Sequence, residues 1–122
     1  MTKNDVLYAT THEWIHVKDN QATIGISSYA AMHLGDIVFF DLPKVGTKFK
    51  QGDSFAAVES VKSASDIYIP VSGLVVAVND QLVDHPELVN EDPFENWIAK
   101  IEISDPNELV TLLNVDAYEA TL

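Results

Sequence analysis

The run SFAAVESVKSASDIYI at residues 54–69 decides the fold that this sequence predicts. Two strand-like segments, 54–59 and 65–69, flank a short polar stretch, so the chain is expected to fold back on itself as a hairpin. The polar stretch contains no Gly or Asn, which disfavours a type I′ turn and favours a type I turn within a slightly longer loop. Lys62 is therefore predicted to lie near the tip of an exposed turn.

Further short strands are predicted on both sides of this hairpin, where apolar residues alternate with polar ones or form short runs between turn residues. They cover residues 6–17, 21–27, 36–42, 74–78 and 97–103. Because no helical crossover separates them, they favour an antiparallel sandwich or barrel.

Short helices are predicted at residues 28–34, 79–88 and 115–120, the second of them interrupted at Pro86. Ser27 or Ser28 can cap the start of the first helix, and Gly35 can end it. A further helix is predicted after Asp105, which is a good N-cap, with Pro106 at the first helical position and Glu108 completing a capping box. The leucines at positions 109, 112 and 113 would share one face of it.

The composition fits one globular domain over residues 1–122, with 47% hydrophobic and 21% charged residues. The absence of cysteine excludes disulfides, thiolate metal sites and a cysteine nucleophile. No apolar run is long enough to cross a bilayer, and residues 1–20 do not resemble a secretory signal. We therefore expect a cytoplasmic protein.

The net charge is −12, and all seven cations are lysines. Such an acidic chain would repel the phosphates of nucleic acids and of anionic membranes, so we expect it to bind neither. The acidic surface could steer the protein towards basic patches on partners, or it could serve only to keep the protein in solution.

The run His12-Glu13-Trp14-Ile15-His16 is a formal match to the H-E-x-x-H pattern of zinc proteases. That chemistry needs a helix, because only helical spacing places residues i and i+4 on one face. This run alternates like a strand, in which residues four apart lie roughly 13 Å from each other. Two histidines at that spacing could not share a zinc ion whose bonds to nitrogen are about 2.1 Å long. A zinc hydrolase is kept only as an alternative, and a structural role for both histidines is favoured.

Lys62 is the only cation between Lys50 and Lys100, and its neighbours Ser60 and Ser63 are small enough to let another protein approach. Taken alone, however, one lysine in a loop is usually an ordinary solvated group. The periodicity of the sequence does not show whether Lys62 is a functional lysine or an ordinary surface lysine.

Residues 8–120 resemble the glycine cleavage system H protein family along nearly their whole length. The matching stretches are YATTHEW (8–14), GISSYAA (25–31), LGDIV (34–38), VESVK (58–62), PVSG (70–73), LVNEDP (88–93) and LLNVDAYE (112–119). The resemblance implies a mainly β fold, a lipoyl/biotinyl-type β-sandwich (barrel-sandwich hybrid) with short helices that include a C-terminal one. It also implies a non-catalytic carrier with lipoic acid attached covalently to Lys62. The modifying enzyme would recognise the neighbouring Glu59, Ser60, Val61 and Ser63.

The same resemblance implies a set of partners. A pyridoxal-phosphate-dependent glycine decarboxylase would load an aminomethyl group on the lipoyl arm, an aminomethyltransferase would remove it, and dihydrolipoamide dehydrogenase would reoxidise the dithiol. A lipoate ligase or octanoyltransferase would attach the arm, and we expect the carrier to be a monomer. The loaded arm would shelter in a cleft formed by Thr11, Glu13 and Asp66, where a pair of carboxylates could face a protonated amine. The alternative is that Glu13 and Asp66 have no functional role and are ordinary solvated acids.

Related carriers remain as alternatives. A biotin carrier normally has methionine on both sides of its lysine, and the lipoyl domain of a 2-oxoacid dehydrogenase usually has Asp-Lys-Ala, whereas Lys62 lies between Val61 and Ser63. An H-like protein that relays lipoate to other lipoyl-dependent complexes is not distinguished by sequence. One departure from the family is the stretch Phe94-Glu95-Asn96-Trp97, which is shorter and lacks glycine, so any partner contact made there is in doubt.

Overall fold

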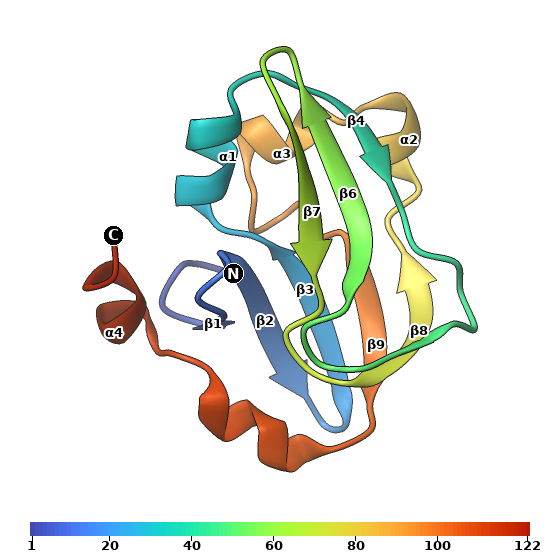
Figure 1. Ribbon diagram of the computed structural model, residues 1–122, viewed down its shortest axis with the longest axis vertical. Helices are drawn as coiled ribbons and strands as arrows, with labels where there is room; N and C mark the ends of the chain where they lie inside the picture. Colours follow the sequence, from blue (N-terminus) through green and yellow to red (C-terminus); the bar gives the residue numbers. More distant parts are fainter.

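A computed structural model describes residues 1–122 and consists of two antiparallel sheets with short helices around them (Figure 1). The larger sheet has the order β1 (Leu7–Tyr8), β2 (Glu13–Lys18), β3 (Gln21–Ile26), β9 (Ala99–Ile103), β8 (Gly73–Val78) and β5 (Lys48–Phe49). The smaller sheet has the order β4 (Ile37–Asp41), β6 (Ser54–Ser60) and β7 (Ala64–Tyr68). Every pairing is antiparallel, which confirms the predicted sandwich class.

The main hydrophobic core lies between the two sheets. It contains 20 buried residues, among them Ile15 and Ile24 from the larger sheet and Val58 and Ile67 from the smaller one. Alternation along each strand explains this arrangement, because every second side chain points to the same face of a sheet. A second cluster of five buried residues lies apart from this core, namely Val6, Tyr8, Trp14, Phe94 and Tyr118.

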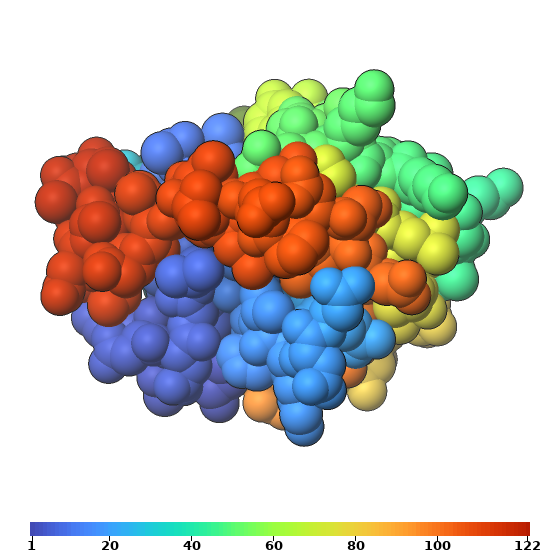
Figure 2. Space-filling model, turned by 90° about the horizontal axis from the view of Figure 1, so that it is seen from below, coloured from blue at the N-terminus to red at the C-terminus, as the bar shows by residue number.

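The helices are α1 (Ser28–Leu34), α2 (Gln81–Asp84), α3 (Leu88–Glu91), the 3₁₀ helix η1 (Pro106–Thr111) and α4 (Val115–Glu119). Ser27 caps α1 by accepting a hydrogen bond from the backbone N–H of Ala30, and Gly35 ends it. Seen from below, the C-terminal segment lies across the N-terminal strands (Figure 2). None of the helices has the length and the apolar character that a bilayer crossing requires.

The predicted strand over residues 6–17 is corrected to two strands, because residues 9–12 form a tight loop. The N–H of His12 donates to the carbonyl of Ala9, and the N–H of Ala9 donates to the carbonyl of Glu13. His12 takes a positive φ of 83° inside this loop, a conformation that non-glycine residues rarely adopt. Similarly, the helix predicted over 79–88 is two short helices, α2 and α3, on either side of Pro86.

The predicted capping box at Glu108 is also corrected. Asp105 is the N-cap, since its side chain accepts from the N–H of Asn107, but η1 is a 3₁₀ helix. The carboxylate of Glu108 instead accepts hydrogen bonds from the N–H and the hydroxyl of Ser72, at 2.7 Å and 2.9 Å. The three leucines do not share a helix face, because η1 ends at Thr111 and Leu113 pairs with Tyr8.

Candidate functional site

Lys62 lies at the tip of the β6–β7 hairpin, as the sequence predicts (Figure 1). The last pair of the ladder is Glu59 opposite Ala64, and the four residues between them form the turn. Within the turn, the N–H of Ser60 donates to the carbonyl of Ser63 at 2.7 Å. The hydroxyl oxygen of Ser60 accepts from the N–H groups of Lys62 and Ser63 at 3.3 Å and 3.1 Å. One serine side chain therefore shapes a turn that contains no glycine.

The turn presents its side chains unevenly. Glu59, Val61, Lys62 and Ser63 are exposed, and Val61 is 70% exposed although it is apolar. Ser60, in contrast, is buried, with 9% of its surface exposed. Among the residues predicted for recognition, Ser60 is thus placed to shape the turn, and the other three are accessible at its surface.

The ammonium group of Lys62 forms no salt bridge, although the chain carries 19 acidic residues. Its Cε atom lies 3.7 Å from the position that a Cβ would occupy at Gly35, so the aliphatic stem rests against the end of α1. A primary amine in this setting can be acylated without breaking any hydrogen bond of the protein.

A cleft of about 390 Å³ lies beside the turn, between α1, β2 and the edge strand β7. It is lined by Thr11, His12, Glu13, Ile26, Tyr29, Ala30, His33, Leu34, Val58, Ser63, Ala64, Ser65, Asp66 and Ile67. The fold therefore brings the three predicted cleft residues, Thr11, Glu13 and Asp66, to the walls of one cavity. Half of the 14 lining residues are hydrophobic, so the cavity suits a ligand with both an apolar and a polar part.

Glu13 is a buried acid, with only 2% of its surface exposed. Its Oε1 atom accepts a hydrogen bond from the hydroxyl of Thr11, and its Oε2 atom accepts one from the N–H of Tyr68 at 3.1 Å. Burial raises the pKa of Glu13 to about 7, despite the opposing effect of these hydrogen bonds. Glu13 is therefore not an ordinary solvated acid.

Asp66 is placed differently from Glu13. It is exposed, and the strand register sets it opposite Ala57, which pairs in turn with Asp41 on β4. Directly opposed residues share one face of an antiparallel sheet, so Asp66 and Asp41 lie on the same face. No hydrogen bond joins Asp66 to Glu13, and the two carboxyl groups are separate features of the cleft wall.

The C-terminal helix supplies a contact to this cleft that sequence reasoning missed. The hydroxyl of Tyr118 lies 2.6 Å from Nδ1 of His12 and 2.8 Å from the hydroxyl oxygen of Ser27. Ser27 also accepts from the N–H of Ala30, so its hydroxyl oxygen links the N-cap of α1 to Tyr118.

Two aromatic rings of α1 complete this wall of the cleft. The ring centroid of Tyr29 lies 4.9 Å from that of His12 and 4.2 Å from that of His33. Burial lowers the pKa of His12, and the neighbouring His33 lowers it further, so both favour the neutral imidazole.

The zinc-protease alternative lacks the helix that it requires. Residues 13–18 form strand β2, and His12 precedes it in the tight loop, with its Nδ1 bonded to Tyr118. No group of three or more potential ligands that could hold a metal ion is present.

The stretch without glycine, residues 94–97, forms a compact turn. Asp92 Oδ1 accepts from the N–H groups of Phe94 and Glu95, and the Asn96 amide donates to two backbone carbonyls. Phe94 is buried against Trp14, with 5.9 Å between the ring centroids. The aromatic residue at the start of this turn therefore packs inside the protein.

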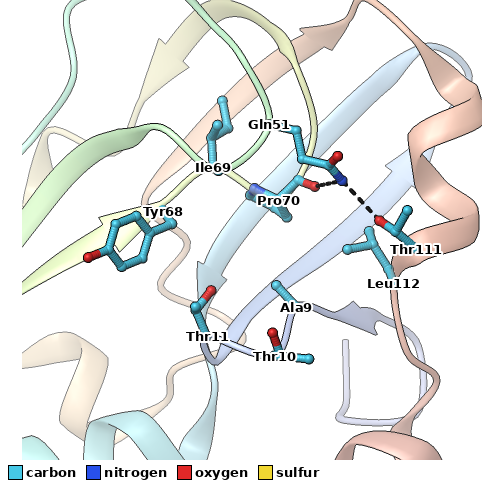
Figure 3. A pocket seen from close by; sticks show the side chains of 10 residues that line it. Ala9, Thr10, Thr11, Gln51, Tyr68, Ile69, Pro70, Thr111 and Leu112 are labelled. Carbon is cyan, nitrogen blue, oxygen red and sulfur yellow. Dashed lines mark hydrogen bonds between the residues drawn. The ribbon is translucent and has the colours of Figure 1, made fainter.

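A second pocket of about 470 Å³ lies at the other end of β7 from Lys62 (Figure 3). The side-chain amide of Gln51 spans part of it and donates to the carbonyl of Pro70 at 3.0 Å and to the hydroxyl of Thr111 at 2.9 Å. None of its ten lining residues is charged, so this pocket offers no ionic partner to a ligand.

Comparison with known proteins gives consistent matches. The family model described as "Glycine cleavage H-protein" matches residues 6–122. A glycine cleavage system H protein from Clostridium botulinum (strain Okra / Type B1) is 52% identical over 116 residues, which cover 95% of this chain and 89% of that protein. One from Staphylococcus epidermidis is 51% identical over 112 residues, which cover 91% of this chain and 89% of that protein. The crystal structure of a glycine cleavage system H protein from Mycobacterium marinum superposes with a TM-score of 0.88 at 35% identity, covering 96% of this chain and 95% of that one.

Proposed function

Because the chain belongs to the glycine cleavage H-protein family, we propose that Lys62 is the residue to which its lipoyl group is attached. The protein is a lipoyl carrier of the glycine cleavage system and is not itself catalytic. The observation that carries the proposal is the position of Lys62, which is exposed at a hairpin tip and has no ionic partner in an acidic protein.

The residues around Lys62 fit a lipoyl group. The free amine can form an amide with the carboxyl group of lipoate, and the half-apolar cleft begins at Ser63, one residue further along the chain. Attachment removes the positive charge of Lys62 and makes the protein one unit more negative. When bound, the lipoyl group supplies a dithiolane that takes up the aminomethyl group of glycine, while the protein supplies reach and recognition.

We propose that Glu13 is the group that meets a cationic amine in the cleft. With a pKa near 7, its carboxyl group is only partly ionised at neutral pH when the cleft is empty. An ammonium ion nearby favours the ionised form, so we expect the arrival of the amine to release a proton from Glu13. Thr11 and the N–H of Tyr68 hold the carboxyl group in place, and the neutral His12 adds no repelling charge. Asp66, exposed on β7, is proposed to add negative charge at the rim.

The partners in the glycine cleavage complex follow from the family, and the individual enzymes are proposals. We propose that the carrier meets the pyridoxal-phosphate-dependent glycine decarboxylase, the aminomethyltransferase and dihydrolipoamide dehydrogenase in turn. A tether raises the local concentration of the reactive group at each of these partners. Neither the lipoate-relay role nor the zinc-hydrolase role gains support from the three relatives described above, which carry the H-protein name.

Three expectations from the sequence stay predictions: that residues 1–122 act as one domain, that the protein is a monomer, and that it works in the cytoplasm. Sedimentation of the purified carrier would measure the second of these directly.

The attachment site can be tested by lipoylation of the purified protein followed by peptide mapping. With lipoate, ATP and a lipoate ligase, we expect one lipoyl adduct per chain, located on Lys62. The Lys62→Arg variant should accept none, while Lys50→Arg, which also changes an exposed lysine, should be modified like the wild type. Both variants should melt near the wild-type temperature, because exposed substitutions typically change stability by less than about 0.5 kcal/mol. An adduct on another lysine would overturn the assignment.

A further inference from the structure

The turn that carries Lys62 rests on the segment of residues 35–37, which runs from the end of α1 to the first residue of β4. The N–H of Val61 donates to the carbonyl of Asp36 at 3.0 Å, and this is a hydrogen bond from the turn to a different element. The stem of Lys62 lies over the same segment, with Cε 3.7 Å from the Cβ position of Gly35. Ile37, at the end of the segment, pairs with Ser60 across the smaller sheet. The segment therefore supports the turn from outside, just as Ser60 shapes it from within.

This supporting segment is itself held by a single side chain from another element. Asn90, in α3, donates from Nδ2 to the carbonyl of Gly35 at 2.7 Å and accepts at Oδ1 from the N–H of Ile37 at 2.9 Å. The side-chain amide of Asn90 therefore bonds to the residues before and after Asp36. The carbonyl of Asp36 in turn accepts the hydrogen bond from the N–H of Val61.

The backbone of the segment is unusual where Asn90 holds it. Gly35 has φ 75° and ψ −149°, a combination that is open almost only to glycine. A glycine linker in such a conformation has many alternatives, so a side chain that bonds both of its ends selects one of them.

We infer that Asn90 is a positioning residue for lipoylation, which holds residues 35–37 so that the turn offers Lys62 in one defined shape. This inference rests on the proposed role of Lys62. A modifying enzyme must recognise the turn before it transfers the acyl group, and a turn that is already ordered costs less to bind than one that must be ordered on binding. Asn90 lies on α3, and its effect passes through Asp36 and Val61 to the turn.

The chain offers a matched control in Asn20. It is also exposed, and its side chain also donates to a backbone carbonyl, that of Ile103 at 2.9 Å. It lies in the turn between β2 and β3, at the end of the molecule opposite the β6–β7 tip (Figure 1). Asn20→Ala therefore removes a comparable hydrogen bond without touching the acceptor turn.

The test combines lipoylation kinetics with amide hydrogen exchange on the full chain. Wild type, Asn90→Ala, Asn90→Asp and Asn20→Ala would each be lipoylated with a lipoate ligase, lipoate and ATP while the carrier concentration is varied. We expect Asn90→Ala to lower kcat/KM on the order of fivefold, mainly by raising KM, because the turn loses pre-organisation. The Val61 N–H should exchange about tenfold faster in this variant, because its acceptor is no longer fixed. Asn20→Ala should match the wild type in both measurements.

Asn90→Asp keeps the acceptor for Ile37 but replaces the donor to Gly35 with a carboxylate oxygen, so it should also raise KM. It serves as the second variant if Asn90→Ala does not fold. Peptide mapping of the wild type, done first, tests the role of Lys62 separately from that of Asn90. With the adduct on Lys62, an unchanged KM in the Asn90 variants, or a Val61 amide that exchanges at the wild-type rate, would overturn the inference.

Discussion

The Nδ1 atom of His12 lies 2.6 Å from the hydroxyl oxygen of Tyr118, although the two residues are 106 positions apart in the chain. The same hydroxyl lies 2.8 Å from Ser27, and the Tyr118 ring stacks on Tyr8 with 4.2 Å between the centroids and 5° between the planes. Burial raises the pKa of Tyr118, so its hydroxyl keeps its proton and can donate it to His12. Through this one group, helix α4 is joined to the wall of the cleft.

Tyr118→Phe is expected to destabilise the fold. The stacked ring stays and Ser27 keeps its bond from the N–H of Ala30, but Nδ1 of His12 loses its partner, and leaving such a polar group unpaired costs roughly 1–3 kcal/mol. Urea unfolding would measure the free-energy change. Because the bond to Tyr118 favours one tautomer of His12, ¹⁵N NMR of that imidazole should show a single tautomer in the wild type and a mixture of tautomers in the variant.

Tyr29→Phe is the matched control, because the Tyr29 ring contacts His12 and His33 but its hydroxyl makes no hydrogen bond in the protein. It should change stability by less than about 0.5 kcal/mol. Equal losses in the two variants would mean that the Tyr118 hydroxyl contributes nothing specific.

The parts of the fold that depend on local patterns were predictable from the sequence. The hairpin around Lys62 follows from two strand-like runs and a polar tip, and the α1 boundaries follow from Ser27 and Gly35 as capping residues. The loop at residues 9–12 was not predictable, because its sharp bend uses His12 at positive φ where a glycine would normally signal a turn. Strand-like alternation on both sides of this loop conceals it.

The same distinction holds for the site. The position of Lys62 was predictable, and the resemblance to the family placed Thr11, Glu13 and Asp66 at one cleft, whose walls the structure forms. Contacts between segments distant in sequence leave no local signal. Examples are the hydrogen bond between the Tyr118 hydroxyl and His12, and the two hydrogen bonds from Asn90 to residues 35–37. The burial of Glu13 is of this kind too, since β7, which supplies the N–H of Tyr68, follows 55 positions later.

Glu13 is expected to make stability depend on pH. Its pKa is about 7 in the folded protein, against an ordinary value near 4.5, so the folded state binds more protons than the unfolded state between these two values. The free energy of unfolding should therefore fall as the pH rises from about 4.5 to about 7, by an amount on the order of 3 kcal/mol, since one pKa unit corresponds to about 1.4 kcal/mol. The Glu13→Gln variant has no titrating group at position 13, so this pH dependence of the unfolding free energy should be absent from it.

The measurement is urea unfolding of both proteins at several pH values between 5 and 8. The difference between wild type and Glu13→Gln cancels the titration of other groups, including His12, whose lowered pKa acts in the opposite direction. Relative to the variant, the wild type should lose stability as the pH rises. A difference that is constant across this range would contradict the raised pKa.

Glu108→Gln is expected to loosen the C-terminal segment from the body of the protein. The carboxylate of Glu108 accepts two hydrogen bonds from Ser72, and bonds to a charged acceptor contribute about 1.5–3 kcal/mol. An uncharged amide can keep only one acceptor oxygen, so part of this stabilisation should be lost in thermal unfolding. Glu102→Gln, an exposed acid on β9, should leave the melting temperature nearly unchanged. If both variants melt alike, Glu108 acts only as a surface charge.

Gly25→Ala is expected to destabilise the fold strongly although it adds only one methyl group. Gly25 lies opposite Trp14 in the β2–β3 ladder, and a Cβ at this position would lie 2.5 Å from two carbons of the indole ring. Trp14 has no room to move, because it is fully buried and its Nε1–H donates to the carbonyl of Pro93.

Overpacking of this kind typically costs about 1–3 kcal/mol and occasionally more. Gly46→Ala provides the comparison, since Gly46 has open space around it and a φ of 93°, so its cost of roughly 1–2 kcal/mol is conformational. If the close approach of the ring is the cause, the smaller ring of Trp14→Phe should relieve it. The double variant should then lose less free energy of unfolding than the two single losses added together. Strictly additive losses in chemical denaturation would show that Gly25 is required for some reason other than the indole ring of Trp14.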